Sequence, residues 1–374
     1  MASTDAISPA IRQRGEPLPP ASRGLRARLP QLLEEESGGI GIGLLRGACT
    51  LVSIPYGLIV RARSAAYRSG LMSSHRLPRP VICVGNITAG GTGKTPLVEA
   101  LARRIGERRK VGILIRGYAP GPDGSDEVGL LRANLPGIEV FPGPDRVRMG
   151  REALEGNEID VFILDDGFQH FRLERDLDIV TIDALRPFGF GRLLPRGLLR
   201  EPITGLRRAR VVALTRTNQV EDEEVRSIRS EIERVHPEAT IIECGVVSSL
   251  ARDPDAPEIP ASALPLEGET VLAFCGIGNP ETFSRSLREM GSASVPIVFP
   301  DHHDYSSGDL RFLEEEGKRV GATAWVTTQK DEPKVRRLSP PSPLWTLRLR
   351  AEFRSGLEAL DEIIEEALVA GRAV

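Results

Sequence analysis

A glycine-rich segment between Val81 and Pro96 holds the residue types that bind phosphate. The apolar run 81–84 leads into a loop that ends in Gly93-Lys94-Thr95, and a helical pattern follows at once. Strand, loop and helix in this order are the context that a P-loop requires, because loop N–H groups and a helix amino terminus then face the phosphates. Lys94 is expected to reach the β- and γ-phosphates, and the Thr95 hydroxyl to ligate Mg²⁺. The predicted ATP site comprises Gly90, Gly91, Thr92, Gly93, Lys94 and Thr95.

The loop departs from the strict P-loop pattern at Thr88, where that pattern has glycine. Gly90 and Gly91 supply backbone freedom instead, which favours a variant P-loop over the alternative of an ordinary glycine-rich turn. Lys94 supports this interpretation, because the chain has five lysines against forty-four arginines. Where arginine serves nearly every basic role, a lysine in this loop indicates a need for its compact ammonium group.

Carboxylates and imidazoles at the ends of other apolar runs could complete the chemistry. Asp165-Asp166 ends the run that starts at Val161, where P-loop folds place the acid that holds Mg²⁺; the alternative is a turn that starts at Asp166. Just beyond, Gln169-His170 either contact substrate hydroxyls or cap the loop. Phosphoryl transfer to an alcohol also needs a base, for which Asp126-Glu127 and the segment 301–304, with His302 and His303, are candidates. Either cluster could equally be a solvated loop.

The elements that position these residues alternate between apolar runs and helical patterns. Continuous apolar runs separated by helices indicate a parallel sheet covered on both faces. The sequence therefore predicts an α/β fold: a P-loop NTPase-like domain over 37–248, a linker over 249–268 and a second, smaller α/β domain over 269–374. In an alternative for the carboxyl terminus, the last helix packs back on the first domain. The predicted strands cover 81–84, 111–116, 138–141, 161–166, 178–183, 211–214, 270–274, 295–299, 324–328 and 344–349.

The amino-terminal region is basic, with eleven arginines and five acidic residues in 1–80 of a chain whose net charge is −3. Such a region suggests an anionic partner such as a membrane surface or nucleic acid. We expect residues 1–36 to be disordered, and no apolar core follows the first basic residues closely enough for a secretory signal. The scarcity of aromatic residues and the lack of a recognisable module argue against nucleic acid. Nothing in the sequence indicates an obligate protein partner, and the four unpaired cysteines suit a cytosolic protein.

Residues 40–60 are apolar but are interrupted by Arg46 and Pro55. The part without a charged residue, 47–60, is shorter than the roughly 18–20 residues of a membrane span. Most apolar side chains fall on one helical face, and arginines follow. This pattern predicts an N-terminal amphipathic helix in a membrane interface. The alternative is a helix packed on the protein's own core.

Several ordered motifs resemble the tetraacyldisaccharide 4'-kinase family, the lipid A kinases of Gram-negative bacteria. The resemblance covers about residues 40–335. A regulatory, membrane-associated P-loop ATPase is the alternative, but such proteins carry a signature lysine where this chain has Ala89. The motifs are 85–96, Arg116-Gly117-Tyr118, Ser125-Asp126-Glu127, 165–170, 191–195, 200–202, 299–302 and 328–331.

The resemblance implies an ATP- and Mg²⁺-dependent kinase that phosphorylates the 4'-hydroxyl of a tetraacylated glucosamine disaccharide 1-phosphate. It implies a peripheral, monotopic enzyme on the cytoplasmic face of the inner membrane, whose active site lies between a larger and a smaller domain. Asp126 would be the catalytic base, supported by His302, while Lys94, Thr95, Asp165 and Asp166 handle MgATP. The doubled His302-His303 leaves open which imidazole is functional. The residues implied in substrate binding are Arg116, Tyr118, Glu127, Arg146, Gln169, His170 and Glu201.

Overall fold

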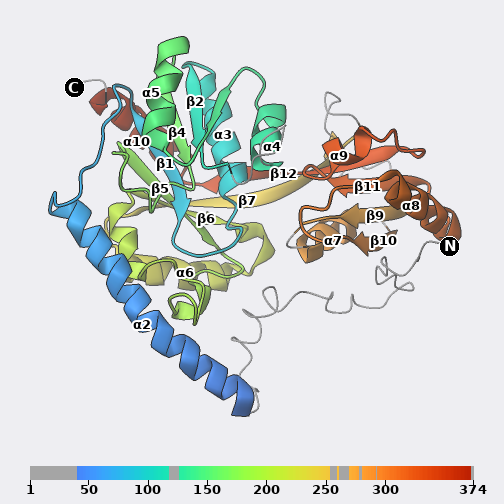
Figure 1. Cartoon of the computed structure of the whole chain (residues 1–374), viewed down its shortest axis with the longest axis horizontal. Helices are drawn as coiled ribbons and strands as arrows, with labels where there is room; N and C mark the ends of the chain where they lie inside the picture. Colours follow the sequence, from blue (N-terminus) through green and yellow to red (C-terminus); the bar gives the residue numbers. More distant parts are fainter. Residues whose placement is uncertain are drawn as a thin grey trace. The chain divides into compact units, whose positions relative to one another are not determined.

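The computed structural model describes residues 40–117, 126–252, 259–260, 269–277, 280–291 and 293–371 (Figure 1). Tyr118 and the predicted disordered segment 1–36 lie outside these residues. The described chain divides into two compact units: a larger one of 40–246 and 350–371, and a smaller one of 247–349.

The described part of the larger unit contains a seven-stranded parallel sheet with β1 near its middle. Every residue of β1, β2, β4 and β6 is buried, which explains the continuous apolar runs in the sequence. In sheet order the strands are β7 (Thr240–Ala251), β6 (Val211–Thr215), β5 (Leu177–Asp183), β1 (Val81–Asn86), β4 (Val161–Asp165), β2 (Val111–Ile115) and β3 (Glu139–Pro142).

Helices cover both faces of this sheet. Leu97 of α3 and Leu360 of α10 are fully buried in the core on one face, together with side chains of α4. Val147 of α5 and Ile228 of α6 are buried in the core on the other face. The last helix therefore belongs to the core of the larger unit. The helices are α3 (Lys94–Gly106), α4 (Asp126–Asn134), α5 (Arg146–Gly156), α6 (Asp222–Val235) and α10 (Leu357–Ala370).

The smaller unit is a parallel sheet in the order β10-β9-β11-β12, with cores on both faces. Trp325 is buried against Leu313 of α8 on one face, and Phe283 of α7 packs on the other. A short strand, β8, pairs antiparallel with the end of β7. The elements are β8 (Ile259–Pro260), β9 (Thr270–Cys275), α7 (Pro280–Glu289), β10 (Ala293–Val298), α8 (Ser307–Val320), β11 (Ala324–Thr328), α9 (Glu332–Arg336) and β12 (Leu344–Ser355).

Helix α2 (Ile40–Arg68) is longer than the predicted 40–60, and Pro55 lies inside it. Its large apolar side chains point away from the protein: Leu51 is 70% exposed and Leu58 60%. From Gly41 to Arg68 it is long and apolar enough to cross a membrane. The alternative, a helix whose apolar face packs on the protein's own core, is therefore not observed. The less exposed residues of the helix recur at helical spacing and are mainly small or polar: Cys49, Ser53, Tyr56, Gly57, Val60, Ser64 and Tyr67.

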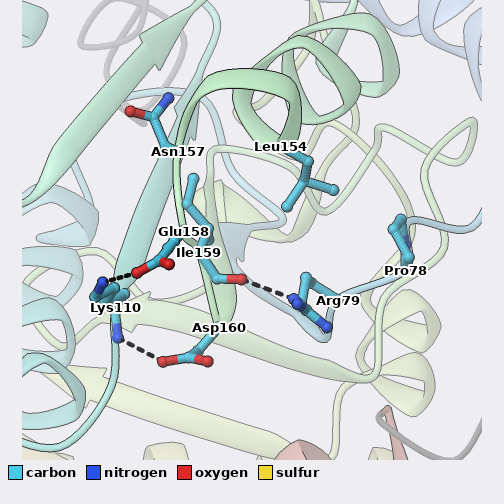
Figure 2. Close-up of a pocket in the computed structure, with 8 residues that line it drawn as sticks. All are labelled: Pro78, Arg79, Lys110, Leu154, Asn157, Glu158, Ile159 and Asp160. Atoms are coloured by element: carbon cyan, nitrogen blue, oxygen red, sulfur yellow. Dashed lines mark hydrogen bonds and ion pairs between the residues drawn. The ribbon is translucent and has the colours of Figure 1, made fainter.

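A polar cavity of about 550 Å³ lies at the amino ends of the strands of the larger unit (Figure 2). Arg79 precedes β1, Lys110 precedes β2 and Asp160 precedes β4. The phosphate-binding motifs lie at the opposite, carboxyl ends, where ligands bind in parallel α/β sheets. This cavity is therefore separate from the candidate active site. Its lining comprises Pro78, Arg79, Lys110, Leu154, Asn157, Glu158, Ile159 and Asp160.

Candidate active site

The predicted ATP-binding residues form the turn between β1 and α3. Gly90 has φ +113° and Gly93, the residue that caps α3, has φ +74°. Residues other than glycine rarely adopt these positive φ values. A Cβ at Gly93 would also lie 3.2 Å from the Cβ of Thr215. The loop therefore needs glycine at both places. Lys94 and Thr95 begin the helix, so their side chains stand at its positive end.

A chain of threonine hydroxyls fixes the loop to neighbouring strands. The Thr92 hydroxyl accepts a hydrogen bond from the Asn86 amide (3.0 Å) and lies 2.7 Å from the hydroxyl of Thr181 on β5. Thr215, at the end of β6, donates to the Thr92 carbonyl oxygen (2.9 Å). All four side chains are buried. The register of the parallel strands brings them together, and sequence analysis identified only Thr92 among them.

Arg216 is a further residue that sequence analysis missed. It directly follows β6, has φ +58°, and donates to the Gly91 carbonyl oxygen (3.1 Å). The same guanidinium pairs with Asp183 at the end of β5. The signal that could have identified Arg216 is its place directly after an apolar strand. A polar residue in that position can be found from the sequence, but its hydrogen bond to the P-loop cannot.

The Asp165 carboxylate is buried beside the phosphate loop. Strand pairing puts Asp165 opposite Val84, and Asp165 is only 5% exposed. Burial raises the pKa of Asp165 to about 7; Lys94 opposes this shift, and the charges of Asp166 and Glu127 add to it. Within the described residues its Oδ1 has no hydrogen-bond partner. A buried carboxylate with an unused oxygen, near other acidic groups, fits a divalent cation.

Asp166 connects the carboxylate pair to two cations. It has φ +50°, and Arg200 donates to both of its oxygens (2.9 and 3.1 Å). The Lys94 ammonium lies 3.6 Å from Asp166 Oδ1. Burial acts to raise the pKa of Asp166, but Lys94 and Arg200 outweigh it, so the pKa is lowered and the carboxylate is charged.

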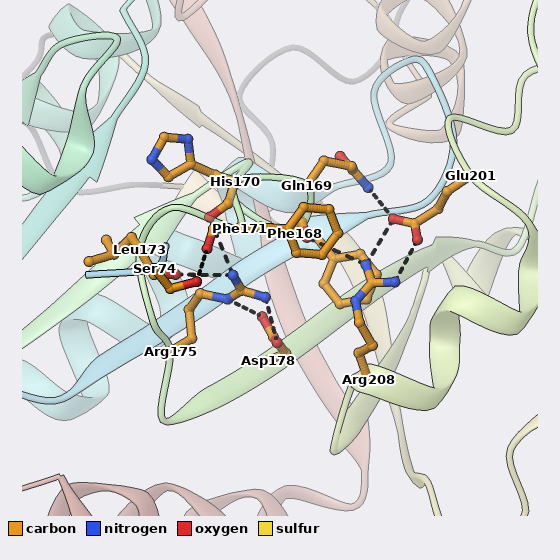
Figure 3. Close-up of polar contacts among 10 residues, drawn as sticks. All are labelled: Ser74, Phe168, Gln169, His170, Phe171, Leu173, Arg175, Asp178, Glu201 and Arg208. Atoms are coloured by element: carbon orange, nitrogen blue, oxygen red, sulfur yellow. Dashed lines mark hydrogen bonds and ion pairs between the residues drawn. The ribbon is translucent and has the colours of Figure 1, made fainter. Parts of the chain in front are cut away.

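Gln169 and Glu201 belong to one partly buried network of hydrogen bonds (Figure 3). The Gln169 amide nitrogen donates to the Asn86 carbonyl oxygen and to Glu201, both at 2.8 Å. Arg208 holds Glu201 through two bonds of 2.7 and 3.0 Å, and its guanidinium lies 4.1 Å from the centre of the Phe168 ring. Both Glu201 oxygens are therefore engaged within the protein.

His170 lies in a strongly basic environment. Burial, with the charges of Arg146 and Arg175, lowers the pKa of His170 to about 4. Arg146 is the buried first residue of α5, and Arg175 donates to the His170 carbonyl oxygen (3.3 Å) while pairing with Asp178 (Figure 3). The imidazole is therefore neutral near pH 7, and a neutral imidazole can both donate a hydrogen bond to a hydroxyl group and accept one from it.

Three further predicted residues, Arg116, Asp126 and Glu127, follow β2 along the chain. Asp126 and Glu127 begin α4 and are half-buried. The charge of Glu127 contributes to the raised pKa of Asp165, after burial and the charge of Asp166. Arg116 directly follows β2 and is exposed. Tyr118 lies outside the described residues.

The two adjacent histidines of the smaller unit have different environments. His302 has φ +60°, and its side chain is 62% exposed, 3.9 Å from Asp301. The His303 ring stacks on Phe299 (centroids 4.7 Å apart), meets Tyr305 edge-on (4.9 Å), and lies 3.3 Å from Asp309. His303 is therefore a packing residue, and His302 is the more exposed of the two imidazoles.

A P-loop with a lysine and a threonine, next to two carboxylates at the carboxyl edge of a parallel sheet, defines a P-loop nucleotide-binding protein. The sequence model of the family described as tetraacyldisaccharide-1-P 4'-kinase matches residues 46–369. The chain therefore belongs to the tetraacyldisaccharide 4'-kinase family.

Individual relatives agree with this assignment. The tetraacyldisaccharide 4'-kinase of Anaeromyxobacter dehalogenans is 35% identical, over 87% of this chain and 92% of the relative. The kinase of the same name from Pelobacter propionicus is 39% identical, over 76% and 81%. Among solved structures, LpxK from Aquifex aeolicus in complex with ATP matches with a TM-score of 0.69 and 32% identity, over 87% of this chain and 99% of that one. These matches favour the kinase interpretation over the regulatory ATPase.

Proposed function

We propose that this protein transfers the γ-phosphate of ATP to the 4'-hydroxyl of a tetraacylated glucosamine disaccharide 1-phosphate in lipid A biosynthesis. The observation that carries the proposal is the family match over 46–369, in a chain whose phosphate loop keeps Lys94 beside the Asp165-Asp166 pair. The ATP complex of the Aquifex aeolicus relative supports ATP as the phosphate donor.

The nucleotide half of the site would work by charge compensation. Thr95, Asp165 and Asp166 would hold Mg²⁺, which supplies positive charge to the phosphate oxygens when bound. Lys94 would stabilise the charge that develops during transfer, and the positive end of α3 would add to it. Arg200 holds Asp166 in place, so the carboxylate needs little rearrangement to serve as a ligand.

The acceptor half of the site would supply a base and hydroxyl-binding groups. Asp126 would accept the proton of the sugar hydroxyl, supported by His302 of the smaller unit. Because both Glu201 oxygens are engaged by Arg208 and Gln169, Glu201 would act by orienting the Gln169 amide. The other residues proposed to contact the sugar or its phosphate are Arg116, Tyr118, Glu127, Arg146 and His170.

The lipid character of the acceptor agrees with the surface of α2. Its exposed leucines would insert into the interface of the inner membrane, with the arginines that follow near anionic headgroups. We propose a peripheral, monotopic attachment on the cytoplasmic face, where ATP is available.

The decisive experiment is transfer of labelled γ-phosphate to a tetraacyl disaccharide 1-phosphate in mixed micelles. We expect labelled lipid from the wild-type protein with Mg²⁺, and none from Asp126→Asn measured beside it. ATP turnover that needs no lipid acceptor would favour the regulatory ATPase instead.

A further inference from the structure

Helix α2 binds the segment 193–200 through side-chain hydroxyls. The Ser53 hydroxyl lies 3.1 Å from the Leu193 carbonyl oxygen, and the Tyr56 hydroxyl donates to the Arg200 carbonyl oxygen (2.8 Å). Burial raises the pKa of Tyr56, so the hydroxyl keeps the proton that it donates. The helix proposed to meet the lipid surface is therefore attached to a segment of the candidate active site.

The same segment is paired with the phosphate loop. The Arg200 N–H donates to the Ile87 carbonyl oxygen (2.7 Å), and the Ala89 N–H donates to the Leu198 carbonyl oxygen (2.7 Å). These two bonds flank an antiparallel bridge between the loop and the segment. The backbone at Arg200 is thus held from one side by Tyr56 and from the other by the P-loop.

The Arg200 side chain extends this connection to the reacting groups. Its guanidinium holds Asp166 at 2.9 Å, and Asp166 lies 3.6 Å from the Lys94 ammonium. A shift of the Arg200 backbone would therefore disturb the P-loop carbonyl at Ile87 and the placement of Asp166 together. Displacements of this kind reduce catalysis, because transfer depends on pre-set geometry.

We propose that Tyr56 is a positioning residue for phosphoryl transfer, which acts through Arg200 to connect the membrane-facing helix α2 to the phosphate site. The inference rests on the proposed function, because it takes the P-loop as the ATP site and α2 as the lipid-facing element. If the proposal is correct, the binding of α2 to a lipid surface affects the rate of phosphoryl transfer as well as the binding of the lipid substrate.

The kinetic test compares Tyr56→Phe with Tyr67→Phe in mixed micelles. Tyr67 lies on the same helix and stacks on Phe171, and its hydroxyl makes no hydrogen bond to any described residue. Loss of one hydrogen bond predicts that Tyr56→Phe lowers kcat about three- to tenfold, with the KM for ATP within about twofold of wild type. Vesicle binding should not change, because the ring remains. Tyr67→Phe should keep the wild-type kcat.

A second measurement needs no acceptor. Hydrogen exchange at the Ala89 and Arg200 amides, followed by mass spectrometry, should be faster in Tyr56→Phe than in wild type and unchanged in Tyr67→Phe. Unchanged exchange in Tyr56→Phe, or a kcat equal to that of Tyr67→Phe, would overturn the positioning role. Failure of the wild-type protein to phosphorylate any lipid would instead overturn the proposed function, and the exchange rates would still decide whether Tyr56 holds the loop.

Discussion

Lys94 and Arg200 share Asp166, yet only Lys94 stands on the helix that follows the phosphate loop. Replacing Lys94 with alanine should lower kcat for lipid phosphorylation by about a hundredfold or more, because phosphate charge is then left uncompensated. Lys110→Ala is the matched control, because Lys110 pairs with Glu158 at the amino ends of the strands, opposite the P-loop. Near wild-type turnover in Lys94→Ala would remove the P-loop from the mechanism.

The neighbouring histidines should separate activity from stability. His302→Ala should lower kcat by about tenfold or more and should change the unfolding midpoint less than His303→Ala does, because the His302 side chain is 62% exposed. His303→Ala should lower the free energy of unfolding by about 1–3 kcal/mol, because the ring packs on Phe299 and Tyr305 and bonds to Asp309. Steady-state kinetics and urea unfolding of both variants provide the test. The reverse pattern would make His303 the functional imidazole.

The low pKa of His170 predicts a pH-dependent contribution to stability. Burial and the charges of Arg146 and Arg175 lower this pKa from 6.5 to about 4. Between those values the unfolded chain binds a proton that the folded protein does not, so the free energy of unfolding falls as pH falls through this window. Removing the imidazole should weaken that fall.

His170→Gln is the variant that tests this contribution. Urea unfolding of His170→Gln and wild type at about pH 7.5 and about pH 5 should show the smaller loss of stability in the variant. Asp145 and Arg172 also lie near this imidazole and are unchanged in the variant, so the difference isolates His170. Equal losses in the two proteins would mean that His170 titrates normally.

At the scale of elements, α2 should bind membranes through its exposed leucines. Leu51→Gln combined with Leu58→Gln should reduce binding to anionic vesicles about tenfold or more, because each leucine contributes up to about 1.5–3 kcal/mol when buried in lipid. Val369→Gln is a matched control, because Val369 is a similarly exposed residue of α10. Flotation with vesicles measures the binding. A loss of thermal stability in the leucine variant would indicate that these side chains pack on the protein.

Elements with uninterrupted local signals could be predicted from the sequence. The strands around 81–84 and 161–166 are continuous apolar runs, and both are buried in the sheet. The strand β7 was not predicted, because Glu243 and Gly245 interrupt its apolar pattern. Its conformation depends on pairing with β6, a contact that no local pattern reports.

Some residues of the candidate site could likewise be predicted from the sequence, and others could not. The types and spacing of Lys94, Thr95 and the carboxylates at 165–166 have a chemical meaning that is visible in the sequence. The roles of Arg216 and Tyr56 depend on backbone carbonyls distant along the chain, at Gly91 and Arg200. Bonds of this kind leave no spacing pattern, so only the folded structure could show them.

At the scale of the whole molecule, two strands belong to both units. The boundary of the larger unit falls within β7, after residue 246, and within β12, after residue 349. Unfolding of one unit would therefore free its own end of each of these two strands, directly next to the residues that the other unit uses. We expect the two units to unfold together, although their cores are separate.

Both tryptophans, Trp325 and Trp345, lie in the smaller unit, so their fluorescence reports its unfolding. Saturating MgATP binds the larger unit in our proposal, and at a hundred times its Kd it should stabilise the folded protein by about 2.7 kcal/mol. If the units unfold together, MgATP should raise the thermal midpoint seen by tryptophan fluorescence as much as the midpoint seen by far-ultraviolet circular dichroism. Lys94→Ala should lack both shifts. A fluorescence midpoint that stays constant while the dichroism midpoint rises would show that the smaller unit unfolds independently, despite the two shared strands.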